Sequence, residues 1–174
     1  MSEFIMKPIR VLFVCMGNIC RSPAAEGILK HFAQHYPQIQ VEVESCGIGD
    51  WHLGSSPDHR MLESSKARGI YLTSKARQFQ KSHLEQFDYI LASDIEIRNT
   101  LYHSALSPEH KAKIGLMTDY SPLHKGEDIP DPYYQAGGGA FELVLDMLED
   151  SCVGLLKHLA IQEGKDKNKK MAPS

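Results

Sequence analysis

The chain has 174 residues, of which 42% are hydrophobic and 24% charged, and its formal net charge at pH 7 is -3. These values are typical of a single globular domain that buries its own core, and the slight negative charge argues against nucleic acid as the main partner. Because its four cysteines do not form a secretory disulfide pattern, and it has neither a signal-peptide pattern nor an apolar run long enough to span a membrane, we expect a cytoplasmic protein.

The first predicted elements are a strand, a short polar turn and a helix. Residues 9–14 form a nearly continuous apolar run, which is typical of a strand buried on both faces of a parallel sheet. In the turn, Gly17 and Asn18 are residue types that readily adopt left-handed backbone conformations. Ser22 and Pro23 suit the N-cap and the first position of a helix, and apolar residues follow at helical spacing.

Two residues of this segment point to chemistry. Cys15 lies at the carboxyl end of the predicted strand, and Arg21 lies six residues later at the start of the helix. Backbone N–H groups of the turn, the helix N-terminus and the guanidinium would favour the thiolate, which is the nucleophilic form of cysteine, and could hold a phosphate monoester against it. The pattern predicts phosphoryl transfer through a cysteinyl-phosphate. The alternative is a buried structural cysteine beside an ordinary capped helix.

Strands and helices alternate along the rest of the chain. Sequence patterns predict strands at residues 41–45, 88–92 and 114–117, and helices at residues 57–67, 96–103 and 141–159. For the helix at 57–67, Ser56 is the expected cap and Gly69 the expected end. This order predicts an α/β fold with a doubly wound four-stranded parallel sheet, helices on both faces and a phosphate-binding loop after the first strand. Ligands bind at the carboxyl ends of such strands, where Ser45, Asp94 and the segment after Met117 would converge.

The two ends of the chain are predicted to lie outside the folded domain. We interpret residues 1–6 as a flexible N-terminal extension and residues 162–174 as a lysine-rich disordered tail. The last helix carries an apolar stripe that should pack against the sheet, and Cys152 falls on that stripe as a core residue. The expected domain therefore spans residues 7–161.

The connection from Thr118 to Gly139 is long for a segment without predicted secondary structure, and such loops are usually functional. Within it, Asp131 lies between Pro130 and Pro132, which bias its backbone toward an extended shape. Local sequence alone slightly favours the interpretation of Asp131 as a turn residue. A tyrosine leaving group, however, has a pKa of about 10 and needs a proton donor at neutral pH, and a carboxylic acid that faces the thiolate could provide it.

At these residues the chain resembles a known family. The segment from Cys15 to Pro23 is similar to the signature loop of the low-molecular-weight protein tyrosine phosphatases, and the segment from Asp131 to Tyr134 is similar to their general-acid loop. The likeness covers most of the chain and includes Ser45 with Gly47 and residues 49–52, 56–60, 75–78 and 87–91. It implies a phosphatase domain that hydrolyses phosphotyrosine in proteins or small aryl phosphates and is inhibited by phosphate and vanadate.

The resemblance also assigns roles to residues. Cys15 would be the nucleophile, Arg21 the phosphate clamp and Asp131 the general acid and then base, with no cofactor and no metal. The supporting residues of the phosphate-binding loop would be Met16, Gly17, Asn18, Ile19, Cys20, Ser22 and Ser45, with Asn18 hydrogen-bonded to Ser45. The substrate pocket would be formed by Trp51, His52, Tyr133 and Tyr134, together with Ile19. A monomer or a weak dimer is expected, with no membrane span and no nucleic-acid partner.

Two further cysteines, Cys20 and Cys46, lie in or near the predicted site. Cys20 lies five residues from Cys15, so an oxidised Cys15 could be trapped as a reversible disulfide; the alternative is a small buried residue beneath the loop. No role is assigned to Cys46.

The chain departs from the family pattern at two positions. Ser74 stands where many members of the family have histidine, and Ile97 stands where asparagine is often found. These departures leave the details of a loop-supporting network open.

Three other functions remain possible on sequence grounds. A thioredoxin-coupled arsenate reductase shares this fold, but it needs two further cysteines near the middle of the chain, and none lies between Cys46 and Cys152. A protein-arginine phosphatase typically has threonine at the position of Ile19. A module that binds phosphate or phosphotyrosine without catalysis would not need Cys15, Arg21 and Asp131 together.

Overall fold

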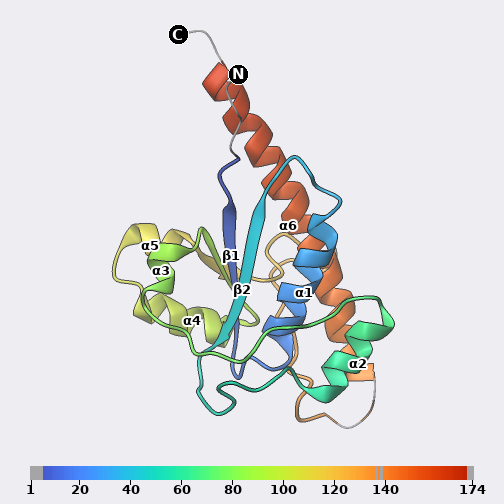
Figure 1. The fold of residues 1–174 in the computed structure, drawn as a ribbon. Coiled ribbons are helices and arrows are strands. Elements are labelled where there is room, and N and C mark those ends of the chain that lie inside the picture. Colours follow the sequence, from blue (N-terminus) through green and yellow to red (C-terminus); the bar gives the residue numbers. More distant parts are fainter. Residues whose placement is uncertain (1–5, 136, 138, 172–174) are drawn as a thin grey trace.

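The centre of the fold is a sheet of four parallel strands in the order β2-β1-β3-β4, of which Figure 1 shows β1 and β2 side by side. The structure is a computed structural model, and it describes residues 6–135, 137 and 139–171. The strands are β1 (Ile9–Cys15), β2 (Val41–Gly47), β3 (Tyr89–Ala92) and β4 (Ile114–Leu116). Since β1 lies between β2 and β3, Cys15 at its carboxyl end is placed near the middle of the sheet edge.

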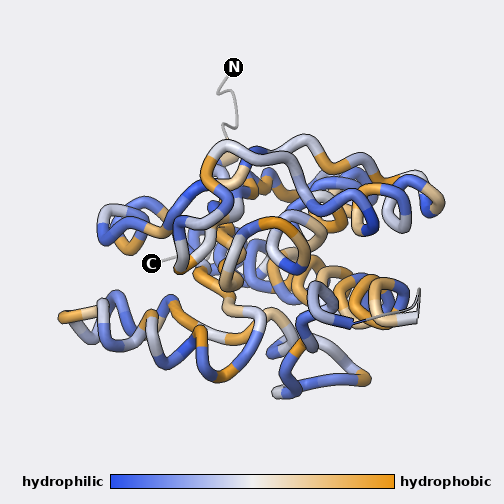
Figure 2. The backbone as a smooth tube through the Cα atoms, turned by 90° about the horizontal axis from the view of Figure 1, so that it is seen from below, coloured by the Kyte–Doolittle hydropathy of each residue, from blue (hydrophilic) through white to orange (hydrophobic). Residues whose placement is uncertain are grey.

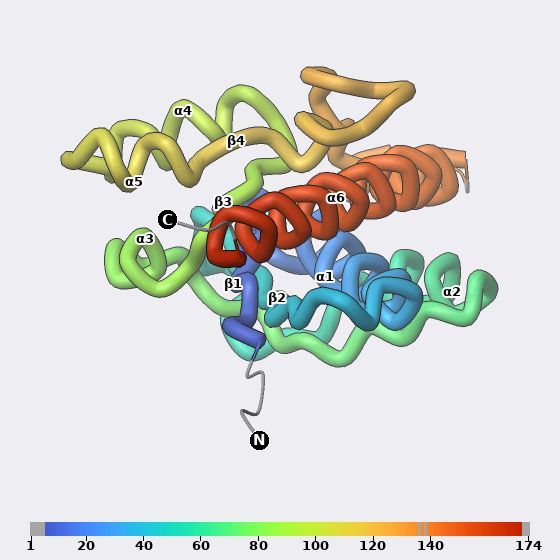
Figure 3. Tube along the Cα trace, turned by 90° about the horizontal axis from the view of Figure 1, so that it is seen from above, coloured from blue at the N-terminus to red at the C-terminus, as the bar shows by residue number. Residues whose placement is uncertain are grey.

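Helices cover both faces of the sheet (Figure 3). They are α1 (Arg21–Ala33), α2 (His59–Ala67), α3 (His83–Gln86), α4 (Ile95–Ser104), α5 (Pro108–Ala112) and α6 (Gly139–Met171). One core cluster joins α1 and α6 to one face, and a second joins α3 and α4 to the other. The predicted doubly wound architecture is confirmed.

Strand β1 contributes to both clusters, as its apolar run predicted. Val11 and Phe13 lie in the cluster with α1 and α6, whereas Leu12 and Val14 lie in the other. All four side chains are buried because successive residues of a strand point to opposite faces. Figure 2 shows hydrophobic residues concentrated in the interior of the trace.

The predicted helix starts are wrong at two places. Helix α1 begins at Arg21, its N-cap Cys20 makes no capping hydrogen bond, and Ser22 lies inside the helix. Helix α2 begins at His59 and is capped by Asp58, not Ser56, because the Asp58 carboxylate accepts the N–H of Arg60. The predicted end of α2 at Gly69 is confirmed by its positive φ of 77°. The short helices α3 and α5 were not predicted, since a single turn shows no periodicity.

The predicted disordered tail is wrong for residues 162–171, which continue α6 as a helix to Met171. The side chains there are mostly exposed, and no proline interrupts the helix before Pro173. Residues 172–174 and residues 1–5 lie outside the described part of the chain, so the predicted N-terminal extension is not tested. Within the described residues, no helix combines the length and apolar character that a membrane span requires. Cys152 is buried in the core cluster of α1 and α6, as predicted.

Candidate active site

The loop that follows β1, residues 15–21 and here called the phosphate loop, is packed backbone to backbone against the end of β2. A Cβ atom at Gly47 would lie 2.8 Å from the carbonyl oxygen of Met16 and 3.0 Å from the backbone nitrogen of Asn18. The backbone N–H of Gly49 donates to the carbonyl of Met16 at 2.9 Å. Glycine at position 47 is therefore required by the close approach of the loop, and β2 fixes where the loop lies.

Asn18 holds the phosphate loop from inside. Its φ of 56° is in the left-handed region, as predicted, whereas Gly17 has no positive φ and is instead crowded by His52, which a Cβ would approach to 3.1 Å. The side-chain nitrogen of Asn18 donates to the hydroxyls of Ser45 at 3.0 Å and Ser22 at 2.7 Å. Its oxygen accepts the backbone N–H of Arg77 at 3.0 Å. The predicted bond to Ser45 is present, and the contribution of Arg77 was not anticipated.

Ser22 contacts the sulfur of Cys15. Its hydroxyl oxygen lies 2.9 Å from Sγ, and both groups are buried. Because the Ser22 oxygen already accepts a hydrogen bond from Asn18, its own proton can be donated to the sulfur or to the carbonyl oxygen of Cys46, which lies farther away at 3.4 Å. This contact explains why Ser22 is not the helix cap that the sequence suggested: its hydroxyl is turned toward Cys15 and not toward the backbone of α1.

Arg21 is buried at the start of α1, and its guanidinium is held by residues far away in the sequence. One terminal nitrogen donates to the Asp94 carboxylate at 2.7 Å and to the carbonyl oxygen of Ile129 at 3.0 Å. Asp94 also caps α4 by accepting the N–H of Ile97 at 2.8 Å. Sequence reasoning placed Asp94 at this sheet edge but did not identify it as the partner of Arg21. The side chain of Ile97, where the family often has asparagine, is buried in the core.

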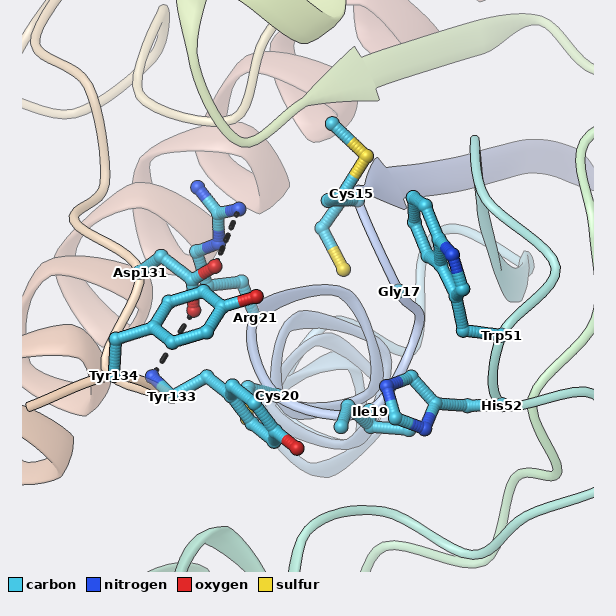
Figure 4. Close-up of a pocket in the computed structure, with 11 residues that line it drawn as sticks. Cys15, Gly17, Ile19, Cys20, Arg21, Trp51, His52, Asp131, Tyr133 and Tyr134 are labelled. Atoms are coloured by element: carbon cyan, nitrogen blue, oxygen red, sulfur yellow. Dashed lines mark hydrogen bonds and ion pairs between the residues drawn. The ribbon is translucent and has the colours of Figure 1, made fainter.

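Asp131 faces Arg21 from the long connection, of which residues 118–135 are here called the acid loop. One of its carboxylate oxygens lies 3.6 Å from the second terminal nitrogen of Arg21, and the other accepts the N–H of Tyr133 at 3.1 Å (Figure 4). The acid loop has neither helix nor strand, as predicted, and the backbone N–H of its Ile129 donates to the carbonyl oxygen of Ser93, the residue that follows β3. Asp131 and Cys15 line the same pocket (Figure 4).

These side chains enclose a pocket of about 240 Å³ (Figure 4). It is lined by Cys15, Met16, Gly17, Ile19, Cys20, Arg21, Trp51, His52, Asp131, Tyr133 and Tyr134. Apart from Asn18, Ser22 and Ser45, which lie buried behind it, every residue predicted for the site lines it. The rings of His52 and Tyr133 face one another with centroids 6.0 Å apart, while Trp51 is 69% exposed and covers Gly49.

Cys20 and Cys46 are the other two thiols near the site, and both are buried. All four cysteines are free thiols. Burial is the main cause that raises the pKa of Cys20, and nearby Asp58 raises it further. Burial also raises the pKa of Cys46, which packs among apolar side chains on the α4 side of the sheet. Both groups are therefore neutral thiols at pH 7, and Cys46 serves as a core residue.

Comparison with known proteins agrees with this geometry. The family model described as low molecular weight phosphotyrosine protein phosphatase matches residues 10–166. A Synechocystis protein named as a low molecular weight protein-tyrosine-phosphatase is 42% identical over 153 residues, which cover 87% of this chain and 96% of the relative. A protein tyrosine phosphatase structure from Entamoeba histolytica is 38% identical, with a TM-score of 0.82 over 90% of this chain and 99% of its own. A Drosophila arginine phosphatase structure is 34% identical, with a TM-score of 0.80 over 87% of this chain and 98% of its own.

Proposed function

The chain belongs to the family of low molecular weight phosphotyrosine protein phosphatases, and we propose that it hydrolyses phosphotyrosine with Cys15 as nucleophile, Arg21 as phosphate clamp and Asp131 as general acid and base. The observation that carries this assignment is the arrangement around one pocket. The Ser22 hydroxyl oxygen lies 2.9 Å from the Cys15 sulfur. A carboxylate oxygen of Asp131 lies 3.6 Å from a terminal nitrogen of Arg21. Nucleophile, anion clamp and proton donor thus surround the space that a phosphoryl group would fill.

In the first step, the Cys15 thiolate attacks phosphorus in line with the phenolic oxygen that leaves. The S–P bond forms as the P–O bond breaks, and Asp131 gives its proton to the departing oxygen. Arg21 binds two equatorial oxygens in a fork, and N–H groups of the phosphate loop bind the third. The product is tyrosine and a cysteinyl-phosphate.

In the second step, Asp131 has become a carboxylate and takes a proton from water. The oxygen of that water attacks phosphorus, the S–P bond breaks, and its electron pair returns to the Cys15 sulfur as inorganic phosphate forms. The Ser22 hydroxyl stabilises the departing thiolate by donation, which its hydrogen bond from Asn18 allows. Ser22 therefore stabilises the Cys15 sulfur first as nucleophile and then as leaving group.

The shape of the pocket favours an aryl substrate. Ile19, His52 and Tyr133 line the same pocket as Cys15 and would contact a phenyl ring. Phosphoserine is too short to bring its phosphorus to a thiolate at the bottom of such a pocket. Inorganic phosphate and vanadate, which present the same oxygens as the substrate, should inhibit by occupying the phosphate loop.

Hydrolysis of phosphotyrosine and phenyl phosphate in the presence of a chelator tests this proposal. Phosphoserine, phosphoarginine and arsenate serve as comparisons in the same assay. We expect turnover of the two aryl phosphates that the chelator leaves unchanged, with little turnover of phosphoserine. Preferential hydrolysis of phosphoarginine would instead favour the activity that names the Drosophila structure, and reduction of arsenate would contradict the phosphatase assignment.

Cys20 is proposed as the thiol that protects Cys15 from irreversible oxidation. The two cysteines line the same pocket and belong to one tight loop. If peroxide converts Cys15 to a sulfenic acid, attack by Cys20 forms the disulfide, and the sulfenic oxygen leaves as water with the Cys20 proton. A thiol reductant then restores both residues.

Mild peroxide should therefore inactivate the enzyme reversibly, with the Cys15–Cys20 disulfide visible by peptide mapping. Cys20→Ala should make the loss harder to reverse, whereas Cys152→Ala, which removes a thiol from the distant core, should not. Phosphate should protect the parent enzyme. Recovery of only sulfinic or sulfonic Cys15 from the parent enzyme would show that Cys20 does not have this role.

A further inference from the structure

Arg60 lies near the start of α2 and reaches the acid loop, although the mechanism above does not use it. One of its terminal nitrogens donates to the carbonyl oxygen of Tyr133 at 3.1 Å. Its guanidinium also lies 4.7 Å from the ring centroid of Phe141, a buried residue at the start of α6, and 5.7 Å from that of Tyr133. The side chain therefore contacts the acid loop and the helix that follows it.

Asp58 fixes the other side of Arg60. Its two carboxylate oxygens accept hydrogen bonds from the Arg60 side chain at 3.1 and 3.0 Å, in the fork geometry that only a guanidinium provides. The backbone N–H of Asp58 donates to the carbonyl oxygen of Ile19, in the phosphate loop, at 2.7 Å. Burial opposes ionisation of Asp58, but its hydrogen bonds with Arg60 outweigh this and lower its pKa, so the pair is charged at neutral pH.

These contacts form a continuous path between the two loops. It runs from Ile19 through Asp58 and Arg60 to Tyr133, whose own N–H donates to the Asp131 carboxylate at 3.1 Å. Among the described residues, no other hydrogen bond joins residues 130–135 to another element. The ion pair of Asp131 with Arg21 cannot replace this path in the first step of the proposed mechanism, because Asp131 must then carry a proton and has no charge to pair with Arg21.

We propose that Arg60 is a positioning residue, which holds the Asp131 carboxyl at the leaving-group side of the pocket by joining the acid loop to the phosphate loop through Asp58. The proposal rests on the role of Asp131 given above. Arg60 itself does not touch the phosphoryl group. Its loss should therefore affect protonation of the leaving group and leave phosphate binding unchanged.

Arg60→Met tests this role, because it keeps a long side chain but removes the guanidinium. We expect kcat for phosphotyrosine to fall about 10- to 100-fold and kcat for p-nitrophenyl phosphate, whose leaving group needs less protonation, to fall less than about 3-fold. Inhibition by vanadate should stay the same. Arg60→Lys should give an intermediate loss, since an ammonium can pair with Asp58 but lacks the fork.

Arg68→Met is the matched control. Arg68 ends the same helix and joins α2 to α6 through ion pairs with Glu142, Asp146 and Glu149, but it lines no part of the pocket. Its loss should reduce thermal stability without changing the ratio of the two kcat values. A change in that ratio with Arg68→Met would mean that any weakening of α2 has the same effect, and would overturn the specific role of Arg60.

A second variant tests the same role in case Arg60→Met misfolds. Asp58→Asn keeps the helix cap and the N–H bonded to Ile19 but removes the charge that fixes Arg60, so it should show the same selective loss at smaller size. In an Asp131→Asn background, Arg60→Met should lower kcat for phosphotyrosine less than about twofold further, because the acid through which it acts is gone.

The outcomes separate the two proposals. If Asp131→Asn lowers turnover of both substrates equally, the acid role of Asp131 is wrong. If Asp131→Asn discriminates between them and Arg60→Met does not, or if the two changes are fully additive, only the role of Arg60 is overturned. A raised KM for phosphotyrosine with an unchanged kcat ratio would mean that Arg60 binds substrate directly, and this too would overturn the proposal.

Discussion

The phosphate loop and the acid loop meet at one pocket but are held by different means. The phosphate loop rests on Gly47, and the buried side chain of Asn18 has all its polar groups paired. The acid loop has no helix or strand, and Tyr134 in it is 86% exposed. The groups proposed to hold the phosphoryl group are thus built into the sheet edge. Asp131, the proposed proton donor, lies in the last part of the acid loop, where among the described residues only the hydrogen bond from Arg60 joins residues 130–135 to another element.

The difference fits the demands of the two steps. In the proposed mechanism, the thiolate and its anion-binding groups keep one geometry from substrate to cysteinyl-phosphate and back, so a rigid phosphate loop is no disadvantage. In the proposed mechanism, the carboxyl group of Asp131 first meets a phenolic oxygen and later a water molecule in nearly the same place. A loop that is tied at Ile129 and at Tyr133 can meet both needs.

The largest effect should come from the rigid side of the comparison. Cys15→Ser should lower turnover of phosphotyrosine at least about 10⁴-fold, because a hydroxyl at this position is a poor nucleophile. Binding of vanadate, followed by calorimetry, should persist because the surrounding N–H groups and Arg21 remain. Residual turnover within about tenfold of the parent enzyme would show that the nucleophile is misassigned.

On the acid side, Asp131→Asn should lower kcat for phenyl phosphate about 10²- to 10³-fold, and kcat for p-nitrophenyl phosphate much less. The reason is that an amide cannot donate a proton at the required moment, and only the more basic leaving group depends on one. Steady-state rates for the pair of substrates measure this. Equal losses for both would remove the functional distinction between the two loops.

Specificity is expected to depend on the side chain of the phosphate loop that forms a wall of the pocket. Ile19→Thr replaces a hydrocarbon arm by a hydroxyl, so it should weaken contact with a phenyl ring and favour a guanidinium. We expect the ratio of kcat/KM for phosphotyrosine and phosphoarginine to fall about 10- to 200-fold. An unchanged ratio would mean that Ile19 does not set the preference.

The smallest expected effect concerns stability. Asn18→Ala should lower the free energy of unfolding by about 2 to 4 kcal/mol, since it leaves the N–H of Arg77 without a partner and places alanine at a positive φ. Tyr134→Ala, in the acid loop, should change it by less than about 0.5 kcal/mol. Urea unfolding of both variants measures the contrast, and comparable losses would contradict it.

Much of the fold could be predicted from local patterns. The apolar run of β1 indicated burial on both faces, and the segment from Cys15 to Arg21 indicated an anion-binding loop between strand and helix. Such patterns are local because burial on one or both faces fixes the spacing of apolar residues within a single element. Helix starts were predicted less well, because several residue types suit the N-cap: Asp58 caps α2, whereas Ser56 was expected to do so.

The partners of the site residues depended on the tertiary structure. Arg21 is paired with Asp94 and Asp131, which are 73 and 110 residues away, because β1 and β3 are neighbours in the sheet and the acid loop starts beyond β4. The hydrogen bond from Arg60 to Tyr133 likewise joins two residues that are 73 positions apart in the sequence. The sequence by itself determined which chemistry the chain carries, through the residue types of two short segments. Only the tertiary structure decided which charges face one another, since strand order and loop paths are set by packing across the whole core.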